Sequence, residues 1–223
     1  MQDNTASTNN LGINPETPVA LRYIAQFVSY LFHPVFLPLY MMSFLLYVHP
    51  FQFLGFTPKM KLLVFVQAFS MYCFFPLVTV GLLKALNFIS SFKLPNRKDR
   101  VIPLVACGIW YFWVWYVWRN IPEYPRTIVH MALGIWITAS IGLFINAYMK
   151  ISLHGMSVGA LLMLLLQLAF TQPIHFGWYL SAGILITGLV STARLLASDH
   201  RPAEVYVGLL TGFISMFLAG FFV

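Results

Sequence analysis

Three ionisable residues near the carboxyl end of the chain have a spacing that could support phosphoryl chemistry. Arg194 precedes His200 by six positions, and His200 precedes Glu204 by four. Residues four apart lie on the same face of a helix, so the glutamate can bond one imidazole nitrogen. Such a bond fixes the tautomer and makes the other nitrogen a nucleophile or base. Since an arginine has a planar donor fork that fits phosphate oxygens, this spacing predicts a phosphate site that contains a histidine.

This cluster interrupts a very apolar chain. The 223 residues are 60% hydrophobic and 9% charged. Such a composition is typical of an integral membrane protein, in which ionisable residues are costly and usually functional. The first 20 residues are polar and lack the features of a signal peptide. We therefore expect residues 1–20 to form a disordered tail and residues 21–223 to form one transmembrane domain.

Hydrophobic length predicts the elements that must position this cluster. The expected fold class is all-α, a polytopic membrane bundle of six to seven transmembrane helices with the active site at one membrane face. Pro34 and Pro38 fall inside the first span, so we expect it to be kinked or broken. The seven candidate spans are about 21–48, 62–89, 101–118, 128–149, 156–171, 176–197 and 205–223.

Polar clusters with basic residues follow the second, fourth and sixth spans, at residues 93–100, 150–154 and 194–204. Two crossings separate each cluster from the next, so all three should lie on the same face of the membrane. This convergence predicts an active site at the membrane surface. The alternative is that basic loops merely anchor one face by the positive-inside rule, which explains the lysines and arginines better than His154 and His200.

Glycines beside the second and third clusters predict close helix packing. Gly155 and Gly159 are four apart, as are Gly208 and Gly212, a spacing that lets two helix backbones approach each other.

The remaining histidines and both cysteines favour structural roles. Each of these histidines stands near the end of a span or next to a proline, and the cysteines lie inside apolar runs. No histidine pair has the spacing of a helical zinc motif, so we expect no metal and no other cofactor. The histidines are His33, His49, His130 and His175.

The three clusters resemble the motifs of the type 2 phosphatidic acid phosphatase superfamily of membrane lipid phosphatases. Its third motif is Ser-Arg, five residues, His, three residues, Asp. Here Arg194 follows an alanine, His200 comes after five residues, and Glu204 after three more. The resemblance covers roughly residues 93–212, with the motifs in the family's order.

The two earlier motifs are similar in part. The family's Pro-Ser-Gly-His resembles Ile151-Ser152-Leu153-His154, which keeps the serine and the histidine. The family's Lys, six residues, Arg-Pro is similar to Lys93, six residues, Arg100, with the proline delayed to Pro103.

This resemblance implies a role for each matched residue. His200 would attack phosphorus and form a phosphohistidine, Glu204 would orient it, and His154 would protonate the leaving alcohol. Positioned donors would hold the phosphoryl oxygens, and water would then hydrolyse the intermediate. The implied phosphate-binding residues are Lys93, Arg100, Ser152 and Arg194.

The function expected from these residues is a membrane-embedded phosphatase for a lipid phosphate or pyrophosphate. Its expected partners are that substrate and membrane lipids, with no nucleic acid. A lipid phosphotransferase of the same fold, a non-catalytic lipid or anion binder, and a small transporter or channel are the alternatives. The resemblance implies a bacterial inner membrane with the site facing the periplasm, whereas the positive-inside count favours the cytoplasmic face.

Overall fold

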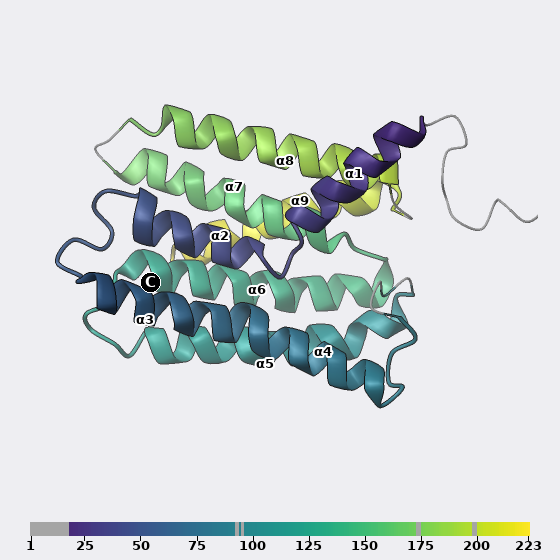
Figure 1. Cartoon of the computed structure of the whole chain (residues 1–223), viewed down its shortest axis with the longest axis horizontal. Helices are drawn as coiled ribbons and strands as arrows, with labels where there is room; N and C mark the ends of the chain where they lie inside the picture. Colours follow the sequence, from purple (N-terminus) through teal and green to yellow (C-terminus); the bar gives the residue numbers. More distant parts are fainter. Residues whose placement is uncertain (1–17, 92–93, 95, 173–174, 198–199) are drawn as a thin grey trace, which may run out of the picture.

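In the computed structural model, residues 18–91, 94, 96–172, 175–197 and 200–223 are described, and every regular element among them is helical. Figure 1 shows the long helices side by side along one axis. They pack into one bundle, in which α9 lies behind α6 and α7 in this view. The elements are α1 (Val19–Leu31), α2 (Leu37–Ser43), η3 (Phe44–Val48), α3 (Pro58–Phe69), η4 (Ser70–Phe74), α4 (Phe75–Ala85), η5 (Lys98–Arg100), α5 (Val101–Trp118), α6 (Arg126–Tyr148), α7 (Leu153–Thr171), α8 (Gly177–Ala197) and α9 (Pro202–Ala219).

Among the described residues, six helices are long and apolar enough to cross a membrane, and this confirms the predicted all-α membrane bundle. A seventh, shorter apolar helix runs through α2 and η3. The six are Pro58–Ala85, Lys98–Trp118, Arg126–Tyr148, Leu153–Thr171, Gly177–Leu196 and Pro202–Ala219.

The first predicted span is broken, as its prolines predict. Helix α1 ends at Leu31 and α2 begins at Leu37, with Pro34 in the connection. Pro38 stands in the first turn of α2, where a missing backbone N–H costs nothing. Helix α1 begins at Val19, so it includes the last two residues of the predicted polar tail. Residues 1–17 of that tail lie outside the described residues.

Helices α7 and α9 pack closely, and their glycines explain the approach. A Cβ atom added to Gly155 would lie 2.7 Å from the carbonyl oxygen of Val205. One added to Gly208 would lie 2.6 Å from the carbonyl oxygen of Ser152. Gly159 and Gly212 have no room for a Cβ either, so the predicted role of both glycine pairs is confirmed.

The three predicted polar clusters meet at one end of this bundle. The Asn146 side chain donates to the Arg97 carbonyl at 2.9 Å, and the Ser152 N–H donates to the Glu204 carbonyl at 3.1 Å. The Arg97 side chain in turn donates to the Tyr148 carbonyl. These bonds join the connection before α5 to the end of α6, and the connection before α7 to the first turn of α9. The predicted convergence is therefore confirmed.

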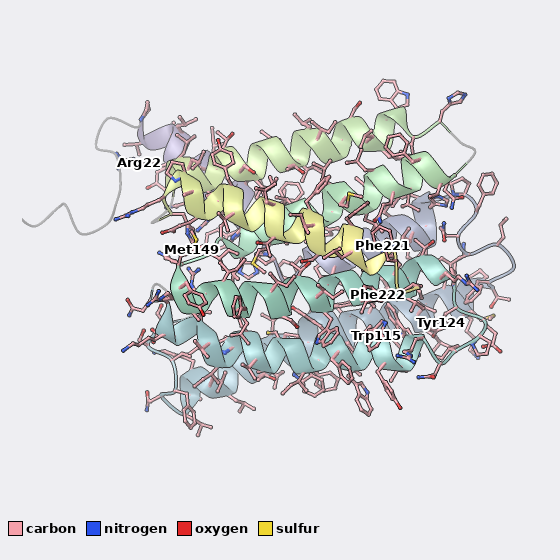
Figure 2. The ribbon with its side chains drawn as sticks, turned by 180° about the vertical axis from the view of Figure 1, so that it is seen from behind. Arg22, Trp115, Tyr124, Met149, Phe221 and Phe222 are labelled. Carbon is pink, nitrogen blue, oxygen red and sulfur yellow. The ribbon has the colours of Figure 1, made fainter. Side chains whose placement is uncertain are left out.

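Figure 2 shows the two ends of the bundle. Arg22 and Met149 lie toward the end with the polar clusters, and Trp115, Tyr124 and Phe222 lie toward the other end. At that second end the Gln67 side-chain oxygen accepts from Trp118 at 3.2 Å and Tyr124 at 2.9 Å. Amphipathic aromatic rings of this kind suit a membrane interface.

The glycine contact gives the first prediction. Gly208→Ala should lower the free energy of unfolding by about 1–3 kcal/mol, the usual cost of overpacking, because its Cβ meets the rigid backbone of α7. Thermal unfolding in detergent measures this change. The matched control is Gly188→Ala in α8, where nothing lies within 4 Å of the new Cβ. Equal stability of the two variants would contradict the backbone contact.

Candidate active site

The imidazole of His200 is held by Glu204 at the start of α9. Nδ1 of His200 lies 2.6 Å from Oε2 of Glu204, and the His200 side chain is 4% exposed. Helix α9 begins at Pro202, which places the glutamate in its first turn. The predicted contact between these residues is confirmed. When Nδ1 donates to the carboxylate, the lone pair of the neutral ring is on Nε2.

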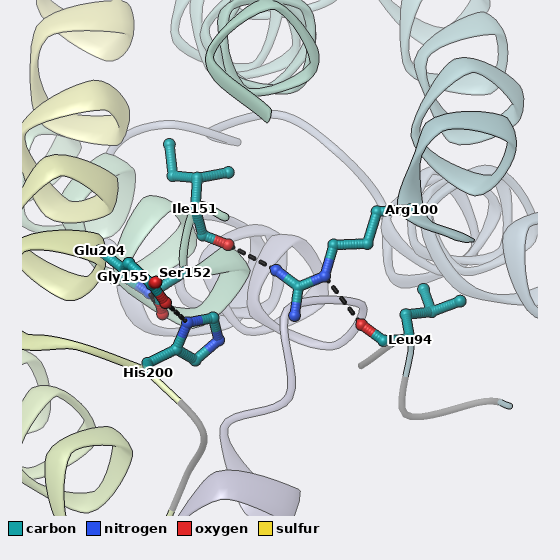
Figure 3. Close-up of polar contacts among 7 residues, drawn as sticks. All are labelled: Leu94, Arg100, Ile151, Ser152, Gly155, His200 and Glu204. Atoms are coloured by element: carbon teal, nitrogen blue, oxygen red, sulfur yellow. Dashed lines mark hydrogen bonds and ion pairs between the residues drawn. The ribbon is translucent and has the colours of Figure 1, made fainter. Parts of the chain in front are cut away.

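Arg100 connects the first polar cluster to the second. Its Nε donates to the Leu94 carbonyl at 2.9 Å, and its Nη1 donates to the Ile151 carbonyl at 2.7 Å. Figure 3 shows the guanidinium between these two carbonyl groups. Leu94 has a φ of 47°, which is uncommon for a residue other than glycine. The guanidinium, 5% exposed, therefore stabilises an unfavourable loop conformation and is itself fixed in place.

His154 stands in the first turn of α7, and its side chain forms a hydrogen bond with a distant part of the chain. Its Nε2 lies 3.0 Å from the backbone carbonyl of Ser29 in α1. A carbonyl can only accept, so Nε2 carries the hydrogen and Nδ1 is the atom that can exchange a proton.

Ser152 has a local structural function. It is the N-cap of α7, and its Oγ accepts from the Gly155 N–H at 3.2 Å. The side chain is fully buried and does not line the cavity described below. A phosphate contact for Ser152 stays a prediction. Lys93, the first residue of the resemblance, lies outside the described residues.

A cavity of about 330 Å³ brings the remaining site residues together. Its polar wall combines Arg100, His154, Arg194 and His200, which come from η5, α7, α8 and the connection before α9. Glu204 lies behind His200 rather than in the wall. The apolar wall includes Pro38, Met41, Pro76, Val80, Leu104, Tyr111, Ile135 and Ala160, from helices α2 and α4 to α7.

Two contributions to this site were missed by the sequence interpretation. His33, which we expected to be structural, lines the same cavity, and its ring lies 5.6 Å from the ring of His154. The Ser29 carbonyl was also missed. The signal for His33 was available, because the His33-Pro34 pair interrupts an apolar run as the other polar clusters do. A backbone carbonyl gives no sequence signal.

The electrostatics of the cavity favour an anion. Two guanidinium groups and three imidazoles line it, and none of the described lining residues is acidic. Burial, together with the nearby charges of Arg100, Arg194 and Lys150, lowers the pKa of His200 to about 3. A neutral His200 can act as a nucleophile.

Within the described part of the chain, no group of three or more histidine, cysteine, aspartate or glutamate side chains is placed to hold a metal ion. No protein-family model, curated protein or solved structure matches this chain.

The lowered pKa gives the second prediction. His200 should stay neutral as the pH falls from 7.5 to 5, whereas an unperturbed imidazole, with a pKa of about 6.5, becomes mostly protonated. The measurement is an NMR titration of histidine-labelled protein in detergent, with His200→Gln to assign the resonance. A resonance that titrates near pH 6.5 would contradict the proposed environment of this ring.

Proposed function

We propose that this membrane protein is a phosphatase that hydrolyses a lipid phosphate or pyrophosphate through a phosphohistidine. One observation carries the proposal: four residues of the three motifs, Arg100, His154, Arg194 and His200, line one polar wall of a cavity that is otherwise apolar. A lipid phosphate has the same division between a charged headgroup and an apolar chain.

In the proposed first step, Nε2 of His200 attacks phosphorus and an N–P bond forms. Glu204 holds the ring by its 2.6 Å contact and stabilises the positive charge that develops on it. Arg100 and Arg194 stabilise the charge on the phosphoryl oxygens. Because Arg100 is already fixed by two backbone carbonyls, its charge is preorganised.

The bond between phosphorus and the lipid oxygen breaks in the same step. His154, protonated on Nδ1, gives that proton to the leaving oxygen, while Nε2 stays bonded to the Ser29 carbonyl. A water molecule then attacks phosphorus and loses its proton to Nδ1 of His154. The N–P bond breaks, inorganic phosphate leaves, and His200 is neutral again.

The shape of the cavity supports a substrate with an apolar chain. Its apolar wall reaches Met41, Val80 and Tyr111, well inside the helices. A chain that entered here would bury apolar surface while its phosphate stayed at the polar end.

The third prediction tests the nucleophile. His200→Ala should reduce phosphate release by at least about a thousandfold, because loss of a covalent catalyst removes the whole reaction path. The assay uses detergent-solubilised protein with phosphatidic acid, phosphatidylglycerol phosphate, an isoprenyl pyrophosphate and a lipid A phosphate. The matched control is His175→Ala, an exposed histidine at the opposite end of the bundle.

Unchanged activity of His200→Ala would overturn the assigned nucleophile. Mass spectrometry of the wild-type protein should detect the phosphohistidine in a peptide that contains His200. Transfer of phosphate to an added alcohol would instead indicate the phosphotransferase. Binding of the lipids without turnover would indicate a non-catalytic binder.

The proposed location is a bacterial plasma membrane with the site on the outer, periplasmic face, which the motif resemblance supports. Several cations at the site end have catalytic roles in this proposal, so they are weak indicators of topology. Arg100 and Arg194 are two of them.

The fourth prediction tests this orientation. A cysteine placed at Ser91, at the site end, should react in intact cells with a maleimide that does not cross membranes, and one placed at Asn120 should not. The unaltered chain is the background control, since Cys73 and Cys107 lie within membrane-spanning helices. The reverse labelling pattern would place the site in the cytoplasm.

A further inference from the structure

His33 stands in the break between α1 and α2 and reaches the polar wall of the cavity. The residue is half-buried, and its ring meets the ring of His154 edge to face at 5.6 Å. None of the three motifs includes it. Because His33 lies in the connection between the two helices, its imidazole can line the cavity.

A hydrogen bond from the local backbone determines which ring nitrogen of His33 carries the hydrogen. Nδ1 accepts a hydrogen bond from the Val35 N–H at 3.4 Å. An imidazole nitrogen that accepts carries no hydrogen, so the hydrogen of the neutral ring is on Nε2. Among the described residues no hydrogen-bond partner faces Nε2, and this atom is not sealed in the protein interior.

Nearby groups make this donor useful for a phosphate. The guanidinium of Arg194 is close enough to His33 and to His154 to act on the charge of both rings. An anion bound in the cavity by this guanidinium would share that cavity with His33 and His154. All three line the same cavity.

We propose that His33 is a further phosphate-binding residue, whose Nε2–H donates a hydrogen bond to a phosphoryl oxygen of the substrate. This inference rests on the proposed function, since it assigns the same cavity to a lipid phosphate. Its contact is with the headgroup, so the effect on binding should be the same for a free phosphate and for one attached to a lipid chain.

A purely structural role is the rival explanation, because Nδ1 of His33 also supports the turn at Val35. Two variants separate the roles. The amide oxygen of an asparagine can replace Nδ1 but cannot reach the position of Nε2. A glutamine can place its amide N–H near the position of Nε2 but loses the bond at Nδ1.

The fifth prediction uses these two variants of the full-length protein in detergent. Binding of inorganic phosphate and of a single-chain alkylphosphonate is measured by calorimetry. His33→Asn should weaken both roughly tenfold to a hundredfold, as expected for a hydrogen bond to a charged group. His33→Gln should keep most of the affinity. Thermal unfolding of each variant checks that it is folded.

Wild-type affinity in His33→Asn together with weak binding in His33→Gln would overturn the inference and indicate the structural role. Loss of affinity for the alkylphosphonate alone would also overturn it, since that result indicates contact with the chain. Binding that depends on His33 in a protein without turnover would support the inference and reject the phosphatase. Normal turnover, with His200→Ala inactive and His33→Asn unaffected, would reject only the inference.

Discussion

The backbone contact between α7 and α9 determines where the reactive groups of this protein lie. Helices in a bilayer gain little from burying apolar side chains against each other, so close packing of small residues holds them together. Gly155 and Gly208 allow this contact at the polar end of both helices. His154 and Glu204 stand within one turn of it. Any side chain at these glycines would separate the two imidazoles that the proposed mechanism uses.

Hydrogen bonds to backbone carbonyls hold two side chains of the polar wall in place. Arg100 bonds the carbonyls of Leu94 and Ile151, and His154 bonds that of Ser29. Carbonyl dipoles satisfy the donors without neutralising the charge of a guanidinium. The cavity therefore stays positive, as an anion site must, while its cations are fixed. An acidic partner at each position would give a stable structure with little affinity for phosphate.

The sequence predicted the elements of the fold and the residues of the site better than their contacts. Apolar runs, the prolines of the first span and the spaced glycines each depend on local physics, which a sequence shows directly. The pair of His200 with Glu204 was predictable from its spacing of four residues, although His200 lies just before α9 rather than on it. The capping function of Ser152 and the place of His33 depend on contacts between distant segments. The spacing of residues along the chain does not predict such contacts.

The break in the first span explains both contributions that the sequence did not show. The last carbonyls of a helix have no partner within it, and they must bond to other groups. Because α1 stops at Leu31, the Ser29 carbonyl is such a group, and His154 bonds it. The same break turns the chain so that His33 faces the cavity. The proline after this histidine thus has two effects: it ends the helix whose carbonyl orients His154, and it presents a further imidazole beside it.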